Sequence, residues 1–93
     1  MSELQELSEI IADLKGPEEI EKFLTELLTE SERKGIALRW RLMDMLFRGV
    51  PQRKISSDLG ISLCKITRGS KIVQDKDSIA RAILLSQSGA DNQ

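Results

Sequence analysis

Apolar positions along this 93-residue chain recur every three or four residues, which is the period of an α-helix. The first such stripe consists of Leu4, Leu7, Ile10, Ile11 and Leu14. Gly16-Pro17 ends it, because glycine suits the position just past a helix and proline suits the first turn of the next. The second stripe consists of Ile20, Phe23, Leu24, Leu27 and Leu28. Residues 1–28 are therefore predicted to form two amphipathic helices.

A third helix is predicted from about residue 30 to residue 48. Thr29 and Glu32 have the spacing of a capping box, which marks its start. The helix is apolar over a wide arc, with two lines of apolar side chains: Ile36, Trp40, Met43 and Phe47, and Leu38, Leu42 and Met45. Such a helix needs cover on both sides, so Trp40 is expected in the core and a homodimer is expected to supply part of the cover. The alternative is a central helix in a monomeric bundle.

Residues 51–70 have the spacing of a helix-turn-helix. A short helix is predicted from Pro51 to Leu59, with a turn at Gly60 and a second helix from Ser62, its N-cap, to about Ser70. The apolar residues that would join the two helices are Ile55, Leu59, Ile61 and Ile66, with the small Ser56 where the helices cross. This motif lays its first helix across a DNA backbone and offers the second to the major groove.

After a polar break, Asp75 or Asp77 is expected to cap a last helix that carries Ile79, Ile83 and Leu84. The chain is short enough to form one domain. Its expected parts are dimerisation helices over 1–48, the helix-turn-helix over 51–70, a C-terminal helix over 75–86 and a polar tail over 87–93. No strand pattern occurs, so the predicted fold class is all-α, with six helices.

The net charge of −1 conceals a strong division along the chain. Residues 1–32 carry ten acidic and two basic residues, whereas residues 33–76 carry eleven basic and three acidic residues. A basic segment that also contains a helix-turn-helix pattern favours a surface for double-stranded DNA. The alternative is a pair of solvated helix faces that happen to differ in sign.

Several classes of function are excluded by composition. The chain has no histidine and a single cysteine, which excludes an intrachain disulfide, a zinc site of the usual Cys/His kind and histidine-based acid–base catalysis. An enzyme is therefore not expected, and neither is a metal. No apolar run approaches the roughly 20 residues of a membrane span, and the N-terminus lacks the pattern of a signal peptide, so the expected compartment is the cytoplasm.

The candidate DNA contacts lie in and around the helix-turn-helix. They are Arg53, Ser56, Ser62, Leu63, Cys64, Thr67 and Lys71. Leu63 and Cys64 offer only apolar or weak contacts, for example to a thymine methyl group, and few of the others form bidentate bonds to bases. Specificity is therefore expected to depend on water and DNA shape, and tight binding on two half-sites. A redox role for Cys64 is the alternative to a small contact residue.

The run Ile66-Thr67-Arg68-Gly69-Ser70, which follows Leu59-Gly60, resembles the Trp repressor family. The resemblance covers roughly residues 26–70 and also rests on Leu28–Arg33, Arg39, Arg41, Arg48-Gly49 and Gln52-Arg53. The Trp repressor is itself a standard example of the helix-turn-helix motif. The resemblance implies an interlocked dimer that binds a palindromic operator, with L-tryptophan as corepressor.

The resemblance also implies a ligand site. Arg39 and Arg68 resemble the arginines that enclose the indole and hold the carboxylate, a role that guanidinium groups suit. Leu28 and Thr29 resemble the floor of that site, and Gly69 a close backbone approach. Two further positions depart from the family. Lys65 stands where a small hydroxyl residue is usual, and Ile72 replaces a polar residue near the ligand's amino group.

The loop Gly49–Gln52 is also one residue shorter than is usual in the family. A subgroup with another ligand, or with none, is therefore one alternative, and surface or phosphate roles for Arg39 and Arg68 are another. The predicted function is a sequence-specific DNA-binding repressor controlled by tryptophan or a related small ligand. The alternatives are a ligand-independent DNA-binding regulator and a helical protein-interaction module.

Overall fold

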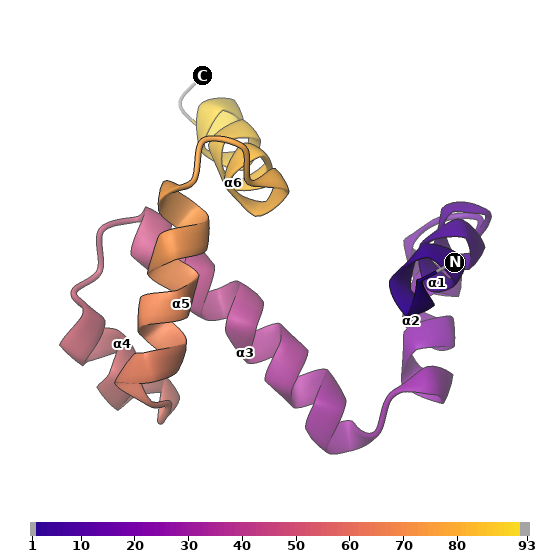
Figure 1. Cartoon of the computed structure of the whole chain (residues 1–93), viewed down its shortest axis with the longest axis horizontal. Coiled ribbons are helices and arrows are strands. Elements are labelled where there is room, and N and C mark those ends of the chain that lie inside the picture. Colours follow the sequence, from indigo (N-terminus) through magenta and orange to yellow (C-terminus); the bar gives the residue numbers. More distant parts are fainter. Residues whose placement is uncertain (1, 92–93) are drawn as a thin grey trace. The chain divides into compact units, whose positions relative to one another are not determined.

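The computed structural model describes residues 2–91, and these form six helices without a strand (Figure 1). The helices are α1 (Glu3–Ala12), α2 (Pro17–Leu27), α3 (Glu30–Phe47), α4 (Gln52–Leu59), α5 (Leu63–Gln74) and α6 (Ile79–Asp91). The predicted all-α class is thus confirmed. The chain divides into two compact units, the first ending at Gly35 and the second beginning at Ile36, so that α3 contributes to both. The predicted one-domain organisation stays a prediction.

The first unit contains no buried side chain in α1 or in α2. Leu4 is 73% exposed and Leu27 is 48% exposed, although both belong to the apolar stripes of the sequence. The helices themselves are well specified, because Ser2 Oγ accepts a hydrogen bond from the Gln5 N–H at 3.1 Å and Pro17 occupies the first turn of α2. The local helices form, but this unit of a single chain has no core of its own.

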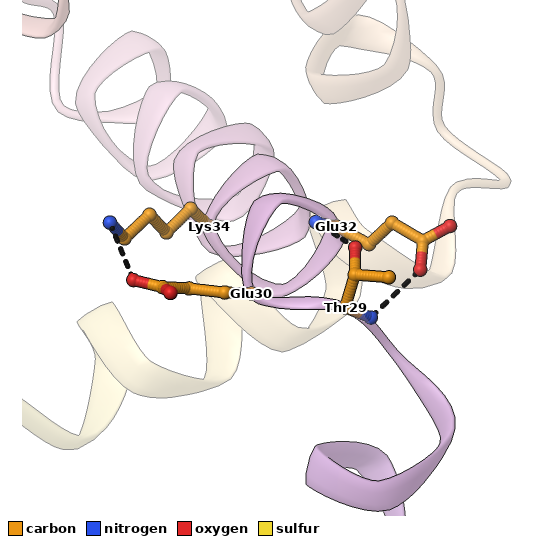
Figure 2. A network of polar contacts seen from close by, with 4 residues as sticks. All are labelled: Thr29, Glu30, Glu32 and Lys34. Carbon is orange, nitrogen blue, oxygen red and sulfur yellow. Dashed lines mark hydrogen bonds and ion pairs between the residues drawn. The ribbon is translucent and has the colours of Figure 1, made fainter.

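The predicted capping box begins α3 (Figure 2). The Thr29 N–H donates to Glu32 Oε1 at 2.9 Å, and the Glu32 N–H donates to Thr29 Oγ1 at 3.1 Å. Arg33 Nη1 also donates to Leu28 O, at 2.8 Å, and thereby ties the end of α2 to the start of α3. The hydrogen bond from the Thr29 backbone is the largest cause that holds the pKa of the Glu32 carboxyl below its ordinary value of 4.5, and the Thr29 side chain adds to it.

The lowered pKa of Glu32 makes a prediction about acid stability. Because the folded-state pKa lies below 4.5, the contribution of ionised Glu32 is complete above about that pH and is lost as the pH falls through the folded-state pKa. In Glu32→Gln the side chain still accepts a bond but no longer titrates, so its free energy of unfolding should fall less over this interval. Urea unfolding at a series of acidic pH values measures the difference. Identical acid dependence in the two proteins would contradict the prediction.

The second unit has a compact core beneath α3, α4 and α5. Leu42, Ile55 and Ile66 are 2%, 0% and 0% exposed and form its centre. Half-buried residues pack around them, namely Met43, Met45, Leu46, Val50, Leu59 and Ile61. Trp40, which was expected in the core, is only half-buried and lies outside this cluster. The centre of this core therefore joins α3 to the predicted helix-turn-helix segment.

The turn between α4 and α5 is closed by three local features. Gly60 has φ +65° and ψ 37°, a left-handed conformation that favours glycine. Ser56 Oγ donates a hydrogen bond to Ile61 O at 2.7 Å, across the turn. Ser62 caps α5, since its Oγ accepts from the Lys65 N–H at 3.4 Å. The conformation of the turn thus depends on Gly60, Ser56 and Ser62, which the sequence pattern had placed at the turn.

Three boundaries differ from the sequence predictions. Helix α5 runs four residues past Ser70 to Gln74, because Val73 continues its buried face. Neither Asp75 nor Asp77 caps α6. Ser78 does so, with its Oγ accepting from the Arg81 N–H at 3.1 Å. Helix α6 continues to Asp91, so residues 87–91, which were predicted to be a polar tail, are helical. Residues 92–93 lie outside the described residues.

Gly69 lies inside α5 on the side that packs against α3, where a Cβ atom would clash with Leu42 Cδ1. Since Leu42 is itself buried, Gly69→Ala should destabilise the chain by about 1–3 kcal/mol, the usual cost of overpacking a core. Gly35→Ala is the matched control, because a Cβ there meets nothing within 4 Å, and it should stabilise α3 by about 0.5–1 kcal/mol. Urea denaturation followed by circular dichroism measures both. Equal stability of Gly69→Ala and the parent chain would contradict this account of the packing.

Candidate functional site

The first two turns of α5 carry a row of exposed side chains above a buried one. Ile66 is fully buried and holds the helix to the core, whereas Leu63 is 52% exposed. Around Leu63 the exposed candidates of the sequence are Ser62, Cys64, Thr67 and, two turns on, Lys71. Thr67 Oγ1 donates to Leu63 O at 2.9 Å, so its hydroxyl oxygen is left to accept a bond from outside the helix.

Helix α4 contributes a cation and a structural hydroxyl. Arg53 is exposed in the first turn of α4 and forms no ion pair with any residue between Ser2 and Asp91, whereas its neighbour Lys54 pairs with Asp58 at 3.3 Å. Ser56 is half-buried and its proton is engaged with Ile61 O. The structure therefore places six of the seven predicted DNA contacts at the surface and gives Ser56 a role in holding the turn.

A pocket of about 190 Å³ lies between α3 and α5. It is lined by Arg39, Leu42, Met43, Lys65, Arg68, Gly69 and Ile72. Four of the six predicted ligand residues thus come together, namely Arg39, Lys65, Arg68 and Gly69. The other two, Leu28 and Thr29, belong to the first unit, where Leu28 O accepts from Arg33 and Thr29 caps α3.

Leu42 and Met43 line the pocket although the sequence prediction did not include them. Their positions are three and four residues after Arg39, which is the spacing that places side chains on the same face of a helix. This spacing from Arg39 is the signal in the sequence that could have identified the two residues. Together with Ile72 they provide an apolar wall, so the pocket combines an apolar wall with cationic side chains.

All the charged side chains that line the pocket are cationic. Arg39, Lys65 and Arg68 are exposed at its edge, and no acidic side chain lines it. The whole second unit has a basic balance, with ten basic and five acidic residues. Guanidinium groups both stack on flat rings and pair with carboxylates, so this arrangement suits a small anion with an apolar body.

The described residues provide no metal site and no membrane span. No group of three or more His, Cys, Asp or Glu residues in the described region is placed to hold a metal ion. Cys64 is exposed on α5. None of the helices between Ser2 and Asp91 has the length and apolar character required to cross a membrane.

The chain is similar to known proteins of one family. A family model described as Trp repressor protein matches residues 2–88. A Trp operon repressor homolog of Actinobacillus succinogenes is 38% identical over 74 residues, which cover 78% of this chain and 73% of the relative. A second, of Vibrio cholerae, is 32% identical over 84 residues, which cover 89% and 82% respectively. A third, of Haemophilus influenzae, is 40% identical over 58 residues, which cover 61% and 57%.

No solved structure gives a significant match to the chain. The family match covers all six helices except the last residues of α6, and so includes both the α4–α5 segment and the pocket. The expected resemblance is confirmed: this chain belongs to the Trp repressor family, a family of transcription regulators.

Proposed function

We propose that this chain is a sequence-specific, DNA-binding transcriptional repressor in which α4 and α5 form the helix-turn-helix. The observation that carries the proposal is the two-sided character of α5. Its inner face is anchored by the fully buried Ile66, while Leu63, Cys64 and Thr67 are exposed beside one another. A helix that enters a major groove needs both a buried face and an exposed face. Its exposed side chains can specify a sequence only if the buried face fixes the position of the helix backbone.

The repressor is proposed to act as a homodimer on a palindromic operator. The apolar stripes of α1 and α2 support this, since neither helix buries a side chain within one chain. Ile36 of α3 is also 54% exposed. A second copy that covered these faces would supply the missing core and would present two α5 helices to two half-sites.

The pocket between α3 and α5 is proposed to control this activity. A ligand there touches both the core helix and the helix that carries the DNA contacts, so its binding free energy can favour one position of α5 over others. The relatives are named for the Trp operon, which makes L-tryptophan the first compound to examine. Lys65 and Ile72 in the lining favour the second candidate, a regulator that responds to another ligand or to none.

The proposal is tested by binding of the purified chain to duplex DNA that flanks its own gene, with a scrambled duplex of equal length as control. Specific binding should exceed binding to the scrambled duplex by about 10³-fold or more. Equal affinity for the two duplexes would remove the sequence specificity. Absence of binding to either, with and without L-tryptophan, would favour the helical protein-interaction module. A change in affinity on adding L-tryptophan would show that this ligand controls DNA binding.

A further inference from the structure

The exposed side of α5 has a definite chemical order. Leu63, Thr67 and Lys71 are spaced by four residues, so their side chains follow one another along the same side of the helix. Cys64 is the neighbour of Leu63 and stands three residues before Thr67, and all four side chains are exposed. The first turn of this side is therefore apolar, the second carries a hydroxyl group and the third carries a cation.

The apolar first turn suits one particular feature of the major groove. Leu63 is 52% exposed and has no polar atom in its side chain. Cys64 is exposed too, and a free cysteine behaves as a small apolar group with a weak S–H donor. Among the groups that base pairs present in the major groove, the 5-methyl group of thymine is the apolar one. Contact with a donor or acceptor instead would leave that polar group without a partner, which costs binding free energy.

The hydroxyl group of Thr67 is left as an acceptor. Its proton is donated to Leu63 O at 2.9 Å, so Oγ1 keeps lone pairs for a donor outside the helix. The donors in the major groove are the amino groups of adenine and cytosine. Thr67 lies about 6 Å beyond Leu63 along the helix axis, and successive base pairs are about 3.4 Å apart. The two contacts should therefore fall within about two base pairs of each other.

The charge of α5 favours DNA over a protein as the partner of this exposed side. The helix contains Lys65, Arg68 and Lys71 and no acidic residue. Arg53, in the first turn of α4, is a further cation that forms no ion pair with another described residue. Charged residues are depleted at the centre of protein–protein interfaces, whereas phosphates border the bases of a groove and pair with cations.

We infer that Leu63 and Cys64 contact the 5-methyl group of a pyrimidine directly, and that Thr67 accepts a hydrogen bond from an adenine or cytosine amino group within two base pairs of it. Thymine and 5-methylcytosine are the two sources of such a methyl group. The inference rests on the proposed function, because it names the features of the operator that α5 selects. Direct contacts then determine specificity at two positions, in addition to the water and DNA shape expected from the sequence.

The test begins with the selection of duplexes from a random library by the full chain, with and without L-tryptophan. Each thymine of the selected site is then replaced in turn by uracil, which lacks only the 5-methyl group. At one position in each half-site the affinity should fall about fourfold, the effect of one buried methyl group, and about 15-fold when both half-sites are changed. A C·G pair at that position should be bound about fourfold more tightly when its cytosine carries a 5-methyl group.

Two pairs of variants assign these effects to side chains. Leu63→Ala should bind the thymine and uracil duplexes equally, whereas Leu85→Ala, which changes a 49% exposed leucine on α6, should keep the fourfold ratio. Thr67→Val should become insensitive to an adenine or cytosine analogue without its amino group, and Thr67→Ser, which keeps the oxygen, should remain sensitive. Because each ratio is measured within one variant, a general loss of stability or affinity does not change it.

The outcomes separate this inference from the proposed function. A selected site that tolerates uracil at every thymine would overturn the methyl contact and leave the sequence-specific repressor standing, and so would a Leu63→Ala variant that keeps the parent ratio. An amino group sensed by Thr67 at more than two base pairs from the methyl group would overturn the assignment of Thr67. A library from which no sequence is enriched would refute the sequence specificity of the proposed repressor, and the inference with it.

Discussion

Replacing Ile66 with alanine is expected to destabilise the second unit by about 2–5 kcal/mol and to abolish binding to duplex DNA. Ile66 is fully buried against Leu42 and Ile55, so the substitution leaves a cavity at the point where α3, α4 and α5 meet. A loss of this size is a large part of the roughly 5–15 kcal/mol that stabilises a typical domain. Urea denaturation followed by circular dichroism measures the first effect, and fluorescence anisotropy with labelled DNA measures the second.

Leu63→Ala is the matched control for that experiment, because Leu63 is an aliphatic residue on the same helix but 52% exposed. Its stability should remain within about 0.5 kcal/mol of the parent chain. Operator affinity should nevertheless fall, while affinity for a scrambled duplex should not. If Leu63→Ala lost stability as Ile66→Ala does, the exposed face of α5 would be structural and its assignment to DNA would fail.

Raising NaCl from 50 to 200 mM is expected to lower affinity for duplex DNA by about 10³-fold or more. That is the loss for a protein that makes at least about six phosphate contacts, because each neutralised phosphate releases a counterion. Arg53→Ala and Lys71→Ala should each reduce the slope of log affinity against log salt by about 1 for each copy of the chain that is bound. The reduction should be the same on the operator and on the scrambled duplex. Both side chains are exposed in the basic second unit.

Lys34→Ala is the corresponding control, since Lys34 lies in the acidic first unit and pairs with Glu30 at 3.0 Å (Figure 2). The salt slope of this variant should equal that of the parent chain. Binding that does not depend on salt would contradict phosphate contacts altogether and would favour the protein-interaction module. Titrations at four or five salt concentrations suffice to determine the slopes.

Local signals in the sequence predicted most of the fold. The capping box of Thr29 and Glu32, the left-handed turn at Gly60 and the cap at Ser62 all involve residues within a few positions of one another, where the sequence alone is informative. The end of α5 was predicted at about Ser70, four residues early, because the burial of Val73 is a tertiary contact without a local signal. Gly69 also has a tertiary role, since it allows α5 to approach Leu42 on α3.

The candidate site could be predicted only in part, for a similar reason. The resemblance to a family identified Arg39 and Arg68, whose charges are visible in the sequence, and the structure brings them to one pocket. Leu42 and Met43 were missed because apolar residues on a core helix are expected to be core. Ser78 was missed as the cap of α6 because two aspartates nearby are equally good caps, and only the path of the turn selects among them.

The length of α5 beyond Gly69 has a mechanical consequence. At its far end Arg81 Nη1, from α6, donates to Val73 O at 2.7 Å, which fixes that end of the helix. With a rise of about 1.5 Å per residue, Arg68 in the pocket lies about 7.5 Å from Val73 along the axis, and Leu63 about 15 Å. A rigid rotation about the fixed end therefore moves the Leu63 end of the helix about twice as far as Arg68. The hydrogen bond from α6 would thus set the point about which α5 rotates.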